Sequence, residues 1–349
     1  MKILNNLLPL TRFAPTKCTE SVFHRTEGRI LASAGLIFSL SILWLSFAPL
    51  TSAAQTWGQQ GIDMDGEAAD DFSGTSVSMP DNNTVAIGAT GNDVNGSGAG
   101  HVRIYRRSGS TWVQKGADID GEAANDESGT SVSMPDSNIV AIGAYWNDGN
   151  GTDAGHVRIY RWSGSTWVQK GADINGEAAD DNSGYSVSMP DSNTVAIGAI
   201  FNNGNGTNSG HVRIYRWSGS AWVQKGADMD GEAAGDWSGN SVSMPDSNTV
   251  AIGAERNNGN GSNSGHVRIY RWSGSAWVQK GVDMDGEANG DRSGWSVSMP
   301  DSNTVAIGAH RNDGNGNSAG HVRIYRWSGS AWVQKGADMD GEAASDQSG

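Results

Sequence analysis

The pattern of apolar and polar positions repeats every 55 residues from Trp57 onward, which indicates an array of similar units. A tryptophan opens every copy, and a histidine holds one later position in each of the five complete copies. The copies cover residues 57–111, 112–166, 167–221, 222–276 and 277–331, and a partial copy covers 332–349. The sequence therefore divides into a leading segment over 1–54 and one repeat domain over 55–349.

Each copy contains four stretches that predict short β-strands. In the second copy, serine and apolar residues alternate over 129–134, IVAIGA covers 139–144, HVRIYRW covers 156–162, and a fourth stretch covers 167–173. No window has the i, i+3, i+4, i+7 apolar spacing of an amphipathic helix. Four antiparallel strands in about 50 residues are typical of a propeller blade, which buries its faces against neighbouring blades. We therefore expect an all-β propeller, with a β-solenoid as the alternative.

The small residues of the AIGA stretch add a packing expectation. Glycine and alanine inside a strand often mark a position where another backbone comes close. We expect the neighbouring sheet to approach the second strand there.

These repeats resemble the FG-GAP repeat of integrin α-chain-type β-propellers, above all its bacterial secreted versions. The resemblance rests on Phe72-Ser73-Gly74 followed by VAIGA over 85–89, on their counterparts in each copy, and on the SVS and W-x-Q-x-G elements. It implies an extracellular propeller that adheres to or recognises a partner, often with bound calcium.

The sequence departs from that family in two respects. Integrin-like blades carry an acidic calcium loop between the first and second strands, whereas a tight MPDSNT turn stands there, as at 189–194. The integrin members usually close with seven blades, and five complete copies are present here. Three arrangements remain open: a tight five-bladed ring, an open arc and a truncated ring.

The first 54 residues have the pattern of an export signal. A basic region precedes an uncharged run from Ile30 to Leu50, and Ser52-Ala53-Ala54 follows as a cleavage site. The alternative is an uncleaved N-terminal anchor, because 21 uncharged residues are long enough to span a bilayer. In both cases we expect the repeat domain to be secreted or at the cell surface. We expect no contact with a membrane unless residues 30–50 remain as an anchor.

Composition and charge exclude several classes of protein. The chain of 349 residues is rich in glycine, with 49, and in tryptophan, with 14, but has only 8 prolines. This composition excludes a collagen-like chain and a helical bundle. Its net charge of −14 argues against nucleic acid as a partner. The single cysteine, Cys18, lies in the leading segment, so the repeats hold neither disulfides nor a cysteine-based zinc site.

One acidic stretch in each copy is a candidate calcium site. In the second copy its carboxylates are Asp118, Asp120, Glu122 and Asp126. Closely spaced carboxylates around a glycine suit Ca²⁺, although the spacing is not that of an EF-hand and the third copy has Asn175 in the middle position. A solvated acidic turn is the alternative. The repeated histidines are interpreted as structural residues at the start of the third strand.

The copies differ from one another at only a few positions. SVSMPD occurs in all five, whereas the position of Phe72, the position three residues later and the pair after AIGA vary. In an antiparallel meander these positions fall at one end of the sheets, so we expect Trp237 to lie beside Glu255-Arg256. We call this set the variable face and expect its side chains to be exposed. Its members are Phe72, Tyr145, Trp146, Tyr185, Phe201, Trp237, Glu255, Arg256, Arg292, Trp295, His310 and Arg311.

The variable face predicts a binding function. Exposed aromatic residues and arginines dominate the energetics of interfaces, and the other two turns of each blade have not varied. Catalysis needs unlike residues at one point, whereas most polar residues here are copied around the array. We therefore expect a non-catalytic recognition or adhesion module for an extracellular protein or glycan. The alternatives are an exported propeller enzyme acting on polysaccharide and a passive surface spacer whose loops drift freely.

Overall fold

Each 55-residue copy folds into its own antiparallel β-sheet. The computed structural model describes residues 58–349, so the candidate signal segment, Cys18 and Trp57 lie outside the described residues. The described residues form one unit, Gly58–Gly349, made of strands and loops without an α-helix. Residues 58–349 accordingly contain no helix long and apolar enough to cross a membrane.

The strands follow the sequence order in every sheet. The first strands are β1 (Ser73–Asp81), β6 (Ser131–Asp136), β11 (Ser183–Asp191), β16 (Ser241–Asp246) and β21 (Ser296–Asp301). The second strands are β2 (Thr84–Ala89), β7 (Ile139–Ala144), β12 (Thr194–Ala199), β17 (Thr249–Ala254) and β22 (Thr304–Ala309). The third strands are β3 (His101–Ser108), β8 (His156–Trp162), β13 (His211–Trp217), β18 (His266–Trp272) and β23 (His321–Trp327).

The fourth strand is split into two pieces in every sheet, which differs from the single strand expected over 167–173. The longer pieces are β4 (Thr111–Gln114), β9 (Trp167–Gln169), β14 (Trp222–Gln224), β19 (Trp277–Gln279) and β24 (Trp332–Gln334). The short pieces are β5 (Ile119–Asp120), β10 (Ile174–Asn175), β15 (Met229–Asp230), β20 (Met284–Asp285) and β25 (Met339–Asp340). Both pieces pair with the third strand, and Gly171 between β9 and β10 has a φ of 87°. Glycine adopts this left-handed conformation without steric cost, so the chain can leave the sheet and return.

The hydrophobic core lies between successive sheets. Every residue of β7 is buried, because the strand packs against a neighbour on both faces. One core cluster joins Val102 and Ile104 of β3 to Val140 and Ile142 of β7, and Met134 completes it. Equivalent clusters join the following sheets. Burial between blades, rather than within one blade, therefore stabilises the fold.

The expected close approach at AIGA is confirmed. A Cβ atom added to Gly143 in β7 would lie 2.1 Å from the carbonyl oxygen of Gly184, the second residue of β11 in the next sheet. That same carbonyl oxygen accepts a hydrogen bond of 2.7 Å from Ser131 Oγ. The second strand thus needs glycine because the next backbone occupies the space of a side chain.

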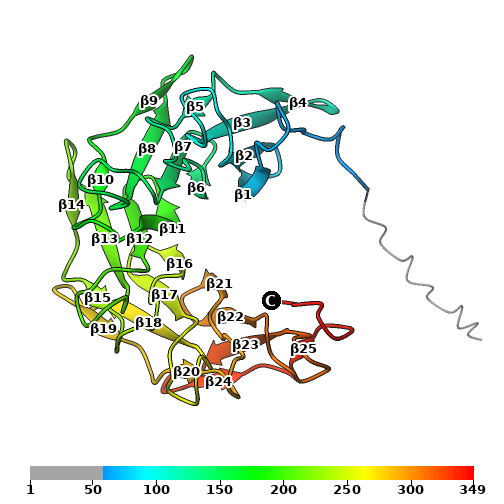
Figure 1. The fold of residues 1–349 in the computed structure, drawn as a ribbon, viewed down its shortest axis with the longest axis vertical. Coiled ribbons are helices and arrows are strands. Elements are labelled where there is room, and N and C mark those ends of the chain that lie inside the picture. Colours follow the sequence, from blue (N-terminus) through cyan, green and yellow to red (C-terminus); the bar gives the residue numbers. More distant parts are fainter. Residues whose placement is uncertain (1–57) are drawn as a thin grey trace, which may run out of the picture. The chain divides into compact units, whose positions relative to one another are not determined.

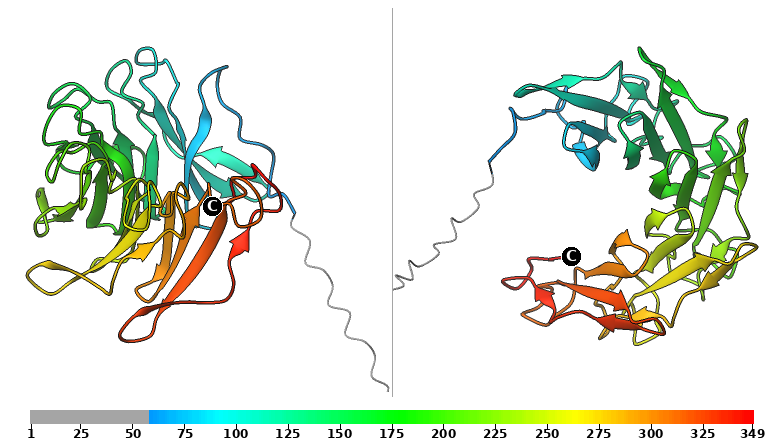
Figure 2. Two further views of the ribbon diagram at one scale, coloured as in Figure 1. Left: turned by 60° about the horizontal axis from the view of Figure 1, so that its bottom comes forward. Right: turned by 180° about the vertical axis from the view of Figure 1, so that it is seen from behind.

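The five sheets of the unit 58–349 follow one another around an arc (Figure 1). The first strands β1, β6, β11, β16 and β21 line its inner side and contact one another in sequence. The view from behind shows the same succession (Figure 2). The expectation of an all-β fold built from repeated four-stranded blades is confirmed, and the fourth strand carries a short continuation.

Candidate functional site: the variable face

The variable positions gather at one end of the sheets, as their place in the sequence predicts. Trp237 precedes β16 and Glu255 follows β17, and these two strands are antiparallel neighbours. The guanidinium carbon of Arg256 lies 3.2 Å from the ring centroid of Trp237, and Arg256 N donates to Asp236 O at 3.3 Å. The expectation that Trp237 lies beside the Glu255-Arg256 pair is confirmed.

Aromatic side chains of the variable face stack on one another. The ring of Tyr145 lies 5.0 Å from that of Trp146 and 5.6 Å from that of Tyr185. Phe201 lies 5.0 Å from Trp237, and Trp295 lies 4.4 Å from His310. These centroid separations are typical of aromatic pairs that stabilise each other. The variable face is therefore partly organised by contacts among its own members.

Ionic contacts join the fourth and fifth copies, and their charges reach a tyrosine of the third. Glu255 is 1% exposed, and its two carboxylate oxygens lie 3.3 and 3.2 Å from Arg292 Nη1 of the next copy. Arg256 Nε lies 3.8 Å from Glu255 Oε1. Burial raises the pKa of Tyr185, and the nearby charge of Glu255 raises it further while Arg256 lowers it. These contacts place Tyr185 of the third copy close to the charged pair of the fourth.

The degree of exposure differs among the members, which corrects the expectation that all are exposed. Phe72 is 65% exposed, Trp146 40% and Trp295 41%. Tyr145, Tyr185, Phe201, Trp237, Arg256 and Arg292 are half-buried, Arg311 is exposed, and Glu255 and His310 are buried. The difference arises because these side chains pack on one another and on adjacent copies. Burial and the charges of Arg311 and Arg292 lower the pKa of His310 to about 4.

The most variable position has a left-handed backbone in every copy, which the sequence did not predict. The values of φ are 53° at Phe72, 49° at Glu127, 54° at Asn182, 58° at Trp237, 57° at Arg292 and 52° at Gln347. Glycine and asparagine are the usual residues in this region, and larger side chains are disfavoured. Residues held in such conformations cost on the order of 1–3 kcal/mol and concentrate at functional sites. The backbone conformation therefore does not favour Phe, Glu, Trp or Arg at this position.

Replacing Phe72 tests this backbone strain. Because Phe72 is largely exposed, Phe72→Asn should raise the free energy of unfolding by about 0.5–1 kcal/mol through relief of the left-handed strain. Chemical denaturation of the two proteins measures the difference. Phe72→Leu is the matched control, since leucine has the same steric conflict at positive φ and should give no gain. Equal stability of the Asn and Leu variants would contradict the strain argument.

The four candidate calcium ligands do not converge on one point. Asp126 is buried, and its Oδ2 accepts hydrogen bonds from Ala123 N at 2.9 Å and Asn147 Nδ2 at 3.0 Å. Asp118 lies beside His101 of the preceding copy, whereas Glu122 lies beside His156 of its own copy. The backbone oxygen of Asp120 accepts from Arg158 Nη2 at 2.7 Å. Within residues 58–349, no three of these four carboxylates form a ligand-sized group.

The repeated histidines lie among carboxylates instead, an arrangement that was missed because one carboxylate belongs to the following copy. His156 at the start of β8 lies 3.8 Å from Glu122 and forms a group with Asp173. Burial, together with the charge of Arg158, lowers the pKa of His156 to about 4, against the raising effect of nearby aspartates. The constant spacing of Glu, His and Asp in all five copies is the signal that could have revealed the group.

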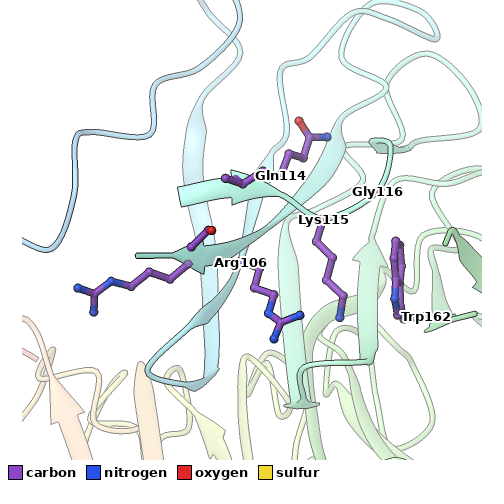
Figure 3. Close-up of a pocket in the computed structure, with 8 residues that line it drawn as sticks. Arg106, Gln114, Lys115, Gly116 and Trp162 are labelled. Atoms are coloured by element: carbon purple, nitrogen blue, oxygen red, sulfur yellow. The ribbon is translucent and has the colours of Figure 1, made fainter. Parts of the chain in front are cut away.

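A groove with invariant residues recurs away from the variable face (Figure 3). Lys115 lies beside Trp162, and its Nζ is 5.1 Å from the ring centroids of Trp162 and Trp167. The ammonium group donates to Ser137 O and to Asn138 Oδ1 in the turn of the next sheet. Its hydrogen bonds therefore hold successive sheets together. Burial lowers the pKa of Lys115.

These sheets are the blades of a β-propeller, with side-chain variation confined to one end. A family model described as the FG-GAP repeat matches residues 117–160, 175–215, 227–270 and 277–325. The matches cover more than half of the chain, so the protein belongs to the FG-GAP repeat family. A search of curated proteins finds no match.

Solved structures resemble the chain at the level of fold. A Bacteroides uniformis protein named as a 6-phosphogluconolactonase has a TM-score of 0.51 at 8% identity, with 76% of this chain and 85% of that chain covered. The β-propeller domain of the Trilobed protease from Pyrococcus furiosus has a TM-score of 0.41 at 11% identity, with 74% and 70% covered. A xyloglucanase from Xanthomonas campestris has a TM-score of 0.44 at 11% identity, with 75% and 38% covered. Identities this low carry no information about activity.

Proposed function

We propose that the protein is a non-catalytic recognition or adhesion module that binds a protein or glycan outside the cytoplasm through the variable face. The observation that carries the proposal is the left-handed position that differs in every copy and holds Phe, Trp and Arg in an otherwise repeated scaffold. Free drift would favour small residues, Asn or Gly at such a backbone. Selection for contact with a partner accounts for large side chains that this backbone conformation disfavours.

The composition of the variable face supports recognition. Trp146 and Trp295 present large aromatic surfaces to solvent, and Arg311 adds an exposed cation. Tryptophan, tyrosine and arginine are the residues that most often dominate binding energy. FG-GAP repeats are typical of extracellular proteins, which supports a secreted or cell-surface location.

Two other functions make different predictions. An exported enzyme acting on polysaccharide would cleave the glycans that it binds, and a passive spacer would bind nothing. Screening the full-length protein on a glycan array and against extracellular proteins, followed by a cleavage assay on each hit, separates the three.

The binding prediction concerns the two exposed tryptophans. The double variant Trp146→Ala/Trp295→Ala should lose about 2 kcal/mol or more of affinity for the hits, because truncating a central aromatic anchor has an effect of this size. Its melting temperature should change little, since about two-fifths of each side chain is already exposed. Affinity is measured by titration calorimetry.

Val168→Ala/Val278→Ala is the matched control. These valines are 52% and 54% exposed on β9 and β19, outside the variable face. The control should bind like the original protein. Full affinity in a folded tryptophan variant would refute recognition through the variable face.

A further inference from the structure

One group of Glu, His and Asp side chains recurs in each of the five copies, on the same end of the sheets as the variable face. We call these groups the Glu-His-Asp clusters. They are Glu67-His101-Asp118, Glu122-His156-Asp173, Glu177-His211-Asp228, Glu232-His266-Asp283 and Glu287-His321-Asp338. In each cluster the glutamate comes from the connection that precedes the sheet, whereas the histidine begins its third strand.

In four of the five clusters the histidine Nδ1 atom lies within 4.0 Å of both carboxylates, and His156 Nδ1 lies within that distance of Glu122 only, in each case without a hydrogen bond. His266 Nδ1 lies 3.8 Å from Glu232 Oε2 and 3.8 Å from Asp283 Oδ2. These separations are too long for direct hydrogen bonds. All five histidines are 1% exposed, and their Nδ1 atoms have no hydrogen-bond partner within residues 58–349. A buried polar atom that recurs five times without a partner requires an explanation.

Both carboxylates are held so that one oxygen faces the imidazole. Glu232 Oε1 lies 3.7 Å from Arg268 Nη1, which leaves Oε2 toward His266. Asp283 Oδ1 accepts a hydrogen bond from Gln279 Nε2, which leaves Oδ2 toward the same histidine. Metal sites commonly have outer partners of this kind, which orient the ligands; here they are one ion pair and one hydrogen bond.

From this geometry we infer that each Glu-His-Asp cluster binds a divalent transition-metal ion of the Zn²⁺ class through one imidazole and two carboxylates. Two ligands of a tetrahedral zinc ion lie about 3.3 Å apart, because each is about 2.0–2.1 Å from the metal. The closest histidine–carboxylate pairs lie 3.6 to 4.0 Å apart, and all ligand atoms of a cluster lie within 4.8 Å of one another, so the ligands would move closer together on binding. Imidazole favours Zn²⁺ and related metals, whereas Ca²⁺ and Mg²⁺ prefer oxygen ligands alone.

The surroundings of the clusters permit entry of an ion. The glutamate side chains of the clusters are 42–46% exposed. The aspartate side chains are 25–29% exposed in the four clusters where the aspartate lies within 4.0 Å of the histidine. The site is therefore buried on the histidine side and open on the carboxylate side. An open side leaves room for water as a further ligand.

Differences between copies predict an order of affinity. A third carboxylate, Asp230 Oδ1, lies 4.0 Å from His211 Nδ1, and Asp285 Oδ1 lies 3.9 Å from His266 Nδ1. The equivalent residue near His156 is Asn175, which carries no charge. We expect the His211 and His266 clusters to bind more tightly than the His156 cluster.

Zinc binding to the full-length protein tests the inference. The protein is stripped with a chelator, titrated with Zn²⁺ and analysed for bound metal by equilibrium dialysis. We expect up to five ions per chain and a higher melting temperature with Zn²⁺, because an ion that binds only the native state stabilises it. Retention of no Zn²⁺ above the level of a buffer control would overturn the inference. Binding of Ca²⁺ without Zn²⁺ would equally overturn it.

Substitutions in one cluster locate the ions. Asp283→Asn and Glu232→Gln change partly exposed side chains and should each remove one bound Zn²⁺ from the total, as should His266→Gln. Asp180→Asn is the control, since Asp180 is an exposed carboxylate outside the clusters and its loss should leave the number unchanged. An unchanged number of ions in both carboxylate variants would assign the bound zinc to another part of the chain and refute the proposed ligands.

Discussion

Gly198→Ala is expected to lower the free energy of unfolding by about 3 kcal/mol, the upper end of the usual range for an overpacked core. The added Cβ would lie 2.1 Å from the carbonyl oxygen of Gly239 and 2.5 Å from Ser186 Oγ. Backbone atoms cannot move aside as the end of a flexible side chain can. Relief of the contact would separate two sheets whose apolar faces form one core. Chemical denaturation followed by tryptophan fluorescence measures the loss.

Gly58→Ala provides the control for the same change of one methyl group. Among residues 58–349, apart from its chain neighbours, nothing lies within 4 Å of a Cβ added to Gly58, so the stability of this variant should be unchanged. If Gly198→Ala and Gly58→Ala were equally stable, the close approach between sheets would not limit the choice of residue.

Arg292→Ala is expected to cost about 3–5 kcal/mol, because it leaves the buried carboxylate of Glu255 without its main partner. Glu255 is 1% exposed, and Arg292 Nη1 contacts both of its oxygens. Arg256 remains 3.8 Å away, but it also stacks on Trp237 and cannot replace the lost contact fully. The loss is measured as a shift of the denaturation midpoint.

A second substitution separates charge from packing. Arg292→Ala/Glu255→Gln should recover part of the stability, because the neutral amide costs less to bury than an unpaired carboxylate. Arg311→Ala, which removes an exposed arginine from the same face, should change stability by less than about 0.5 kcal/mol. If Arg292→Ala behaved like Arg311→Ala, the ion pair with Glu255 would contribute nothing to the fold.

The sequence predicted the second and third strands most accurately. The ranges expected over 139–144 and 156–162 match β7 and β8, because the apolar run IVAIGA and the stretch HVRIYRW are both bounded by clear turn residues. The break between β9 and β10 was not predicted. It lies in a short segment around Gly171, where no periodicity distinguishes a strand from a loop.

For the site, antiparallel pairing was enough to predict which variable residues meet. It placed Trp237 beside Arg256 without any knowledge of side-chain conformation. Burial of Glu255 could not be predicted in this way, since it depends on Arg292 from the following copy. The Glu-His-Asp clusters escaped notice for the same reason: each combines residues from two copies.

The contacts between successive sheets have a consequence for how the variable face can change. Ser131 Oγ donates to Gly184 O and Ser186 Oγ donates to Gly239 O, so each junction uses the same residues in the same roles. A blade moved to another place in the series would meet the same neighbouring groups. The order of blades is therefore free with respect to the core and the serine bonds, but decisive for the variable face, where buried Glu255 needs Arg292 of the next copy. Reordering whole blades would give new combinations of Tyr, Trp, Glu and Arg without a single new core residue.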